Sequence, residues 1–327
     1  MNTKLAMTAA KRGGWFDRTD ALAAGYSDTE IRSRVRAGRW VRLCRGAYAE
    51  LRPGEESLAN WDRVQWRHLR AAKAVYHRLG GRAVVSHQSA LLLHGLEAGG
   101  LDLTRIHVTR LTGHGRADAS VVQHSPRPEV VDPVEVGGVL ATPGPRSVVE
   151  AIRYARYPIA VSVVDEALRK VIASRDQLAD ALALFAGRVG IGTANRAVEF
   201  GDGRSESVGE SRLRVLLSDL GLPPPIPQVE IRDESARLIG RVDFLLERWG
   251  LIIEFDGVLK YGGRTSAALV AEKAREDRLR DLGYEVVRVI WAELAQPAEV
   301  VRRIRLAIRR SSARRAPIAG SATAAGL

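Results

Sequence analysis

Cysteine is almost absent from this chain: Cys44 is the only one among 327 residues. A single thiol forms no disulfide within the chain and supports no cysteine-based zinc cluster, and such scarcity fits a cytoplasmic location. Long apolar runs are missing as well. No stretch reaches the roughly eighteen apolar residues of a membrane helix, and the first residues, MNTKLAMTAAKRGGWF, lack the apolar core of a signal peptide. We therefore expect a cytoplasmic protein with no membrane partner.

Acidic residues are too few to balance the basic ones. The chain has 50 lysines and arginines against 38 aspartates and glutamates, a formal charge of +12 and a pI near 10.4. This excess favours a polyanionic partner, and nucleic acid is the first candidate because no membrane segment is present. The alternative is a solvated arginine-rich surface. Hydrophobic residues make up 46% of the chain, which is enough for globular cores, and the length suits about two or three domains.

Three changes in composition divide the chain, and it contains no internal repeat. An arginine-dense region ends near Pro53-Gly54, a Gly/Ser-rich stretch spans 200–210, and a low-complexity basic tail begins near Arg309. We predict a winged helix-turn-helix over 12–52, a mixed α/β middle domain over 53–200, a further α/β domain over 205–310 and a disordered basic tail over 311–327. The predicted fold class is α/β, or α+β taken over the whole chain.

The first of these regions has the order of elements of a winged helix. RTDALAAG predicts a short helix that ends at Gly25, and SDTEIRSRVRAG predicts a second helix. Ser27 and Glu30 have the spacing of a capping box, and Gly38 supplies the left-handed residue that ends the helix. RWVRLCRGAYAE then alternates, which predicts two short strands around a turn at Arg45-Gly46.

Arginines are concentrated on these elements, with no acidic residue between Ile31 and Ala49. The candidates for DNA contacts are Arg32, Ser33, Arg34, Arg36, Arg39, Arg42 and Arg45. A recognition helix and a wing need such side chains, because phosphate contacts set affinity and register while contacts with base edges set sequence preference. The alternative is a solvated helix face beside a small apolar core.

Residues 60–200 are mostly helical by periodicity. WDRVQWRHLRAAKAVYHRLG and SVVEAIRYARYPIAVSVVDEALRKV predict the clearest helices, and RIHVTRL and ASVVQHS predict strands between them. His87 and His94 lie seven residues apart on a helical stretch, where packing is favoured over a metal pair. His107, His114 and His124 lack a spacing typical of metal ligands and are interpreted as loop and strand residues.

The C-terminal third predicts the order αβββαβα, with an acidic pattern on its central hairpin. Side chains alternate across a strand, so Glu254 and Asp256 share one face of GLIIEFDG. Asp243 lies on the preceding strand among apolar residues. A turn at Trp249-Gly250 brings Asp243 close to Glu254.

Carboxylates this close together in an apolar setting repel one another and are unfavourable to desolvate. A divalent cation removes both penalties, and oxygen-rich sites suit Mg²⁺ or Mn²⁺, which also bind phosphate oxygens and activate water. Two alternatives remain open. The acids pair with arginines, or Asp256-Gly257 is only a turn. The arginines available for such pairs are Arg241, Arg248, Arg264, Arg278 and Arg288.

GRVDFLLERWGLIIEFDG, preceded by ESRLRVLLSDLGLPPPIPQ and followed by DRLRDLGYEVVRVIWAEL, resembles domains related to very-short-patch-repair endonucleases, in the PD-(D/E)XK nuclease superfamily. The resemblance covers residues 205–305 and implies a restriction-endonuclease-like αβββαβ fold. It also implies that Glu210, Asp243 and Glu254 hold Mg²⁺ or Mn²⁺.

The same resemblance implies catalytic roles for Asp243, Glu254, Asp256 and Lys260. Asp256 would ligate the metal or orient a water, and Lys260 would position the scissile phosphate or the attacking water. The lysine of the superfamily lies two positions after the last acid, where this chain has Asp256. Lys260 lies four residues further on and reaches the same space from the turn.

GYSDTEIRSRVRAGRWVRLCRGAYA resembles the N-terminal winged-helix domain of AbiEi-type antitoxins, the repressor partners of type IV toxin–antitoxin systems. VSHQSALLLHGL and VLATPGPRSVVEAIR resemble the segment that follows this domain. The resemblance covers residues 12–155 and implies DNA as a partner and a toxin as a partner protein.

Two functions are compatible with these features. In the first, the protein is a metal-dependent DNA endonuclease that the N-terminal domain localises on DNA, alone or with a repair partner. In the second, it is a non-catalytic DNA-binding regulator or antitoxin with a nuclease-like fold. The three acids favour the first and Asp256 in the lysine position favours the second. RRIRLAIRRSSARR near the C-terminus is either a second phosphate-binding segment, which would add salt-dependent, nonspecific affinity, or a solvated basic tail.

Overall fold

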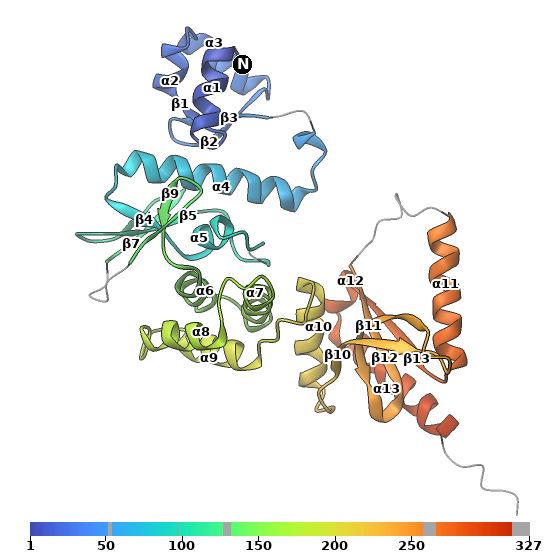
Figure 1. Cartoon of the computed structure of the whole chain (residues 1–327). Helices are drawn as coiled ribbons and strands as arrows, with labels where there is room; N and C mark the ends of the chain where they lie inside the picture. The colour runs from blue at the N-terminus through green and yellow to red at the C-terminus, as the bar shows by residue number, and fades with distance from the viewer. Residues whose placement is uncertain (52–53, 98, 127–131, 258–265, 316–327) are drawn as a thin grey trace, which may run out of the picture. The chain divides into compact units, whose positions relative to one another are not determined.

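The computed structural model describes residues 1–51, 54–97, 99–126, 132–257 and 266–315 (Figure 1). The chain divides into two compact units, Met1–Gly201 and Asp202–Leu327. Both contain helices and a mixed or antiparallel sheet, so the predicted α/β class is confirmed. A boundary near 52 inside the first unit stays a prediction. In the described part of the chain, no helix is long and apolar enough to cross a membrane.

The first unit begins with a winged helix-turn-helix. Its elements are α1 (Thr3–Lys11), β1 (Phe16–Asp17), α2 (Arg18–Ala23), α3 (Asp28–Arg36), β2 (Trp40–Cys44) and β3 (Ala47–Glu50). The strands form an antiparallel sheet in the order β1-β3-β2. Ser27 and Glu30 form the predicted capping box on α3, and Gly38 has the predicted positive φ, +70°.

The sequence interpretation missed α1 and β1, which precede the first predicted helix. Asn2 caps α1, because its side chain accepts a hydrogen bond from the backbone of Leu5. The helix buries Leu5 against an aromatic core in which the ring of Trp40 meets Phe16 and Tyr26 edge to face, at 4.7 and 5.1 Å. This core fixes the position of α3.

The rest of the sheet structure of this unit follows a long helix. Its elements are a 3₁₀ turn η1 (Glu55–Ser57), α4 (Asn60–Leu79), β4 (Ala83–Val85), α5 (His87–Leu93), β5 (Ile106–Arg110), β6 (Arg116–Ala117), β7 (Val121–His124), β8 (Val134–Val136) and β9 (Val139–Ala141). The strands form a six-stranded mixed sheet in the order β6-β7-β5-β4-β9-β8. The pairs β5–β7 and β4–β9 are parallel.

Helix α4 takes part in a core that is shared by the winged helix and the six-stranded sheet. Ala71 and Val75 of α4 are buried together with Leu43 of β2 and Val108 of β5. The side chain of Arg67 also donates to the carbonyl of Arg42 at 2.7 Å. The two parts of the first unit are therefore joined through one helix.

Four further helices complete the first unit: α6 (Gly144–Ile152), α7 (Tyr157–Arg169), α8 (Arg175–Ala183) and α9 (Ile191–Phe200). The prediction of a single helix for SVVEAIRYARYPIAVSVVDEALRKV is wrong, because this segment forms two helices: α6 ends at Ile152 and α7 begins at Tyr157. Pro158 lies in the first turn of α7. Proline has no N–H for an interior helical bond and its ring excludes a preceding helical turn, so it begins the second helix.

The second unit has the predicted order αβββαβα. Its elements are α10 (Val208–Asp219), β10 (Ile226–Arg232), β11 (Leu238–Leu246), a 3₁₀ turn η2 (Glu247–Trp249), β12 (Leu251–Asp256), α11 (Ser266–Asp281), β13 (Glu285–Ile290), the short α12 (Trp291–Leu294) and α13 (Pro297–Arg315). The sheet order is β10-β11-β12-β13, with β12 and β13 parallel and the other pairs antiparallel.

The alternation predicted for the central hairpin is confirmed. Ile253 packs with α10 and α13 on one side of the sheet, whereas Ile252 packs with Leu279 of α11 on the other. Gly250 turns the chain with φ +54°. Helix α13 continues to Arg315, into the segment 311–327 for which disorder is predicted. Residues 316–327 lie outside the described ones.

Candidate functional site

The first candidate site is the solvent face of α3. The core side of this helix is marked by Ile31, which is buried, and Val35, which is half-buried. Arg32, Ser33 and Arg36 lie on the exposed side. These three predicted DNA-binding residues therefore share one accessible helix face, as a recognition helix requires.

Arg34 differs from the other arginines of this group. Its guanidinium carbon lies 4.9 Å from the ring centre of Tyr26 and 5.3 Å from that of Trp40. Both distances are in the range of cation–π interactions. Arg34 thus contributes to the packing of the winged helix, a role that the sequence pattern does not distinguish from DNA contact.

The remaining predicted DNA-binding residues, Arg39, Arg42 and Arg45, have exposed side chains. The backbone carbonyls of two of them are held by hydrogen bonds. The carbonyl of Arg42 accepts from Arg67, and that of Arg45 accepts from Arg78 at 3.4 Å. Both donors belong to α4, so this helix holds the β2–β3 hairpin in place.

The second candidate site is the acidic cluster of the second unit. The Oδ2 atom of Asp243 accepts a hydrogen bond of 2.7 Å from the backbone of Phe255. Burial, helped by the nearby negative charges of Glu210 and Glu254, raises the pKa of Asp243 to about 6 against the effect of that hydrogen bond. Asp243 of β11 therefore lies within the electrostatic influence of acids from α10 and β12, but among the described residues the three carboxylates do not form a group with ligand atoms within 4.8 Å of one another.

Close contact between α10 and β12 places Glu210 in this cluster. A Cβ atom on Gly209 would lie 1.8 Å from a ring carbon of Phe255, so only glycine allows this approach. The carboxylate of Glu210 is then held by three donors, at 2.8 to 2.9 Å: the backbone of Glu206, the hydroxyl of Ser207 and the amide of Gln228. It is an ordered, buried carboxylate.

Glu254 is held by arginines, one of the alternatives considered for these acids. Its carboxylate lies 2.6 Å from Arg275 and 3.4 Å from Arg288. For a divalent cation, the carboxylates of Glu210 and Asp243 fit the preference of Mg²⁺ for oxygen ligands, while Arg275 competes for Glu254. Asp256 lies at the end of β12 and is half-buried, and Lys260 lies outside the described residues.

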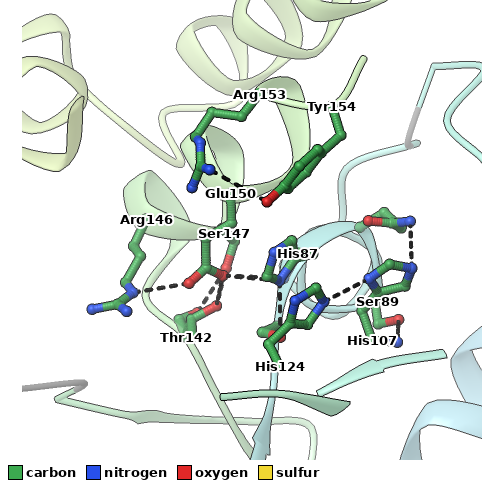
Figure 2. A network of polar contacts seen from close by, with 12 residues as sticks. His87, Ser89, His107, His124, Thr142, Arg146, Ser147, Glu150, Arg153 and Tyr154 are labelled. Atoms are coloured by element: carbon green, nitrogen blue, oxygen red, sulfur yellow. Dashed lines mark hydrogen bonds and ion pairs between the residues drawn. The ribbon is translucent and has the colours of Figure 1, made fainter. Parts of the chain in front are cut away.

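A third site, in the first unit, was missed by the sequence analysis. His87 begins α5, His107 lies on β5 and His124 ends β7. Each of them offers a ring nitrogen, and these nitrogens all lie within 4.8 Å of one another (Figure 2). His87 has a positive φ of +53°, a backbone conformation that residues other than glycine rarely adopt. Such strain persists where the surrounding contacts impose it.

The direction of each hydrogen bond in the cluster follows from its neighbours. The amide nitrogen of Gln88 donates to the carbonyl of Asp102 and to Nε2 of His107, at 3.0 and 2.9 Å. Nδ1 of His107 therefore carries the ring hydrogen and donates it to Nε2 of His124, at 3.0 Å. Burial and the neighbouring His124 lower the pKa of His107 to about 3. The ring is neutral with both nitrogens in use.

The spacing of these histidines along the chain gives no indication of the cluster. Parallel pairing of β5 and β7 sets Thr109 opposite His124, and this pairing brings the histidines together. His94, which was considered with His87, points elsewhere and contacts the carbonyl of Thr142 at 2.8 Å. His107 and His124 are strand residues, as predicted, but their proximity to His87 was not predicted.

Comparisons with known proteins bear mainly on the winged helix. Residues 4–50 match the family model described as "Transcriptional regulator, AbiEi antitoxin". Two proteins of Mycobacterium tuberculosis, from strains CDC 1551 / Oshkosh and ATCC 25618 / H37Rv, are similar over most of the chain. Each is 29% identical over 272 residues, or 83% of this chain and 93% of its own length, and each is named only as uncharacterized.

The match confirms the AbiEi resemblance for the N-terminal segment, including α1, which the sequence analysis placed outside the domain. The resemblance of the second unit to very-short-patch-repair endonucleases stays a prediction. The N-terminal segment of this chain is thus similar to a family of transcriptional regulators.

Proposed function

We propose that this protein is a cytoplasmic DNA-binding transcriptional regulator that reads DNA with α3. The observation that supports it most is the exposed face of Arg32, Ser33 and Arg36 on the second helix of a winged helix-turn-helix. The match of residues 4–50 to a regulator family supports the same function. The basic charge of the chain, +12, adds sequence-independent attraction to the phosphate backbone.

The test uses the full-length protein and a DNA duplex that the protein selects from a random library. Fluorescence anisotropy over a series of salt concentrations gives both affinity and salt dependence. An Arg32→Met/Arg36→Met variant should bind more weakly, and its slope of log K against log salt should fall by about 0.9 for each phosphate that is no longer neutralised. Arg169→Gln, an exposed arginine on α7, is the matched control. Failure to select any sequence, or equal binding by all three proteins, would reject the proposal.

The family description also includes antitoxins, so a toxin partner belongs to this proposal. Co-expression with the product of each neighbouring gene, followed by growth measurement, tests it directly. Growth arrest that this protein relieves supports the partner. Relief that persists when the Arg32→Met/Arg36→Met variant replaces it would mean that neutralisation acts by another route than DNA binding.

A second candidate function, metal-dependent DNA cleavage, is favoured by one observation: the charges of Glu210 and Glu254 both act on the buried carboxyl group of Asp243. In this proposal Glu210 and Asp243 hold Mg²⁺ or Mn²⁺, which would polarise a phosphodiester and activate water. Glu254 would exchange one arginine contact for the metal. Asp256 and Lys260 would orient water and phosphate.

The experiment for this candidate is cleavage of supercoiled plasmid and of mismatched duplexes with Mg²⁺, with Mn²⁺ or with chelator. Nicking that requires metal and is abolished in Asp243→Asn supports an endonuclease. Asp219→Asn, at the exposed end of α10, controls for the removal of one acid in the same unit. Absence of cleavage on every substrate, with normal DNA binding, would leave the regulator as the function.

A further inference from the structure

A pocket adjoins the histidine cluster. Its volume is about 270 Å³, and its walls include His87, Thr109, His124, Arg146, Tyr154 and Arg188. These residues come from α5, β5, β7, α6 and the segments that follow α6 and α8. Figure 2 shows the carboxylate of Glu150 between Arg146 and His87, with Tyr154 above the histidines.

A buried arginine with open donors lines this pocket. Arg146 is 6% exposed, and only its Nε is engaged, in a bond of 3.0 Å with Oε1 of Glu150. Within the described ranges, its two terminal nitrogens have no hydrogen-bond partner. The four N–H bonds of these two nitrogens are open donors, and the nitrogens are not among the fully buried atoms that lack a partner, so a molecule in the pocket can accept from them.

Other side chains add donors around the same space. The side chain of Thr109 lines the wall, but its hydroxyl is buried away from the open space and is not counted as a donor. The hydroxyl of Tyr154 accepts from Arg153 at 3.3 Å, which leaves its own hydrogen to donate. Arg188 is exposed, and no ion pair with a described residue neutralises it.

Acceptors are scarce in the pocket by comparison. Glu150 is its acidic residue, and both of its carboxylate oxygens are already engaged. Oε1 accepts from Arg146, while Oε2 accepts from the backbone of His87 and the hydroxyl of Thr142, each at 3.2 Å. Because the negative charge of Glu150 is paired with Arg146, the positive charge of Arg188 is not neutralised by an acid in the pocket. The pocket therefore has surplus donors and a surplus positive charge.

The geometry disfavours a metal ion, the other ligand that three clustered imidazoles suggest. The rings of His87 and His124 stack with centres 3.8 Å apart and planes 10° from parallel. Lone pairs in the planes of stacked rings run side by side and do not converge on one ion at the 2.0–2.1 Å typical of zinc–nitrogen bonds. In addition, Nδ1 of His107 uses its hydrogen to bond His124.

We propose that this pocket binds the phosphate group of a small phosphorylated molecule. Arg146 and Arg188 supply the charged donors, and the hydroxyl of Tyr154 supplies one more. A guanidinium fork matches the oxygens of a phosphate, and charge-assisted hydrogen bonds of this kind are short and strong. The volume lies just below the range of most ligand pockets, about 300–1,000 Å³, which limits the ligand to at most about the size of a mononucleotide.

The test is calorimetric titration of the full-length protein with inorganic phosphate, ribose 5-phosphate and adenosine monophosphate, at an ionic strength kept constant with sodium chloride. We expect saturable binding that Arg188→Gln and Arg146→Lys each weaken about tenfold or more, the usual effect of removing a charge-assisted hydrogen bond. Arg188→Gln is the decisive variant because this side chain is exposed and its replacement does not disturb folding. Arg169→Gln should bind normally. Preference for one of the two organic phosphates over inorganic phosphate identifies a small molecule as the ligand.

Four outcomes would overturn the proposal. The first is the absence of saturable binding for all three probes at millimolar concentration. The second is binding that is equal in wild type and Arg188→Gln. The third is binding of Co²⁺ with the visible absorption of a tetrahedral nitrogen site, abolished in His124→Asn, without binding of phosphate. Displacement of bound phosphate by duplex DNA would assign the pocket to the nucleic-acid backbone and equally reject a small molecule.

Discussion

His68 on α4 makes the stability of the first unit depend on pH. Its ring is 3% exposed and lies between two hydrogen-bonding groups. A carbonyl only accepts, so Nδ1 donates to Leu103 at 2.9 Å, and the hydroxyl of Ser89 therefore donates to Nε2 at 2.8 Å. Ser89 in turn accepts from the backbone of His107. These three hydrogen bonds can form together in these directions only while the His68 ring is neutral, because a protonated Nε2 could not accept from Ser89.

Burial lowers the pKa of His68 from 6.5 to about 4. The unfolded chain therefore binds a proton between pH 6.5 and 4 that the folded chain does not bind. Stability is unaffected above this window and decreases as pH falls through it, at about 1.4 kcal/mol per pH unit. Between pH 7 and pH 5 the decrease from His68 alone is about 2 kcal/mol.

The assay is urea unfolding at pH 7 and pH 5 of the full-length protein and of His68→Gln, followed by tryptophan fluorescence. Glutamine retains a donor but does not titrate. We expect the free energy of unfolding of the wild type to fall by about 2 kcal/mol more than that of the variant over this range, because every other titrating group is common to both proteins. Equal decreases in the two proteins would refute the argument, and so would a ring pKa near 6.5 measured for His68 by NMR.

Two further pairs of variants test the packing that positions the candidate sites. Gly209→Ala should destabilise the second unit by about 1–3 kcal/mol because its Cβ would collide with Phe255. Gly192→Ala on α9, which has open space around its Cβ, should instead stabilise by about 0.4–1 kcal/mol, and equal urea midpoints for the two variants would contradict this. Arg34→Met should lower stability by about 0.5–2 kcal/mol because its interactions with the two rings are removed, whereas Arg36→Met should weaken DNA binding with unchanged stability. Anisotropy and thermal unfolding, measured on both arginine variants, distinguish these effects, and identical behaviour would show the assignment to be wrong.

Local patterns were sufficient to predict much of the fold. The capping box of Ser27 and Glu30 and the glycine stop at Gly38 act within one helix, so they can be identified without tertiary information. The strand alternation that separates Ile252 from Ile253 is equally local. These features predicted the winged helix and the order of elements in the second unit.

Features that depend on distant segments were not predictable in this way. The pairing of Glu254 with Arg275 joins β12 to α11, and Arg275 was not among the arginines considered. The histidine cluster requires the parallel pairing of β5 and β7, which no spacing along the chain encodes. The division of α6 from α7 carries a local signal, Pro158, which the strong apolar periodicity around it concealed.

The shared core beneath α4 has a consequence for how this protein would respond to DNA. Leu43 of the winged helix and Val108 of the six-stranded sheet are buried against the same helix. The winged helix is therefore packed against the sheet through α4 and is not attached only by a flexible linker. Contacts made by α3 therefore restrain the sheet as well. An operator duplex should slow amide hydrogen exchange in β4 and β5, although neither strand belongs to the winged helix.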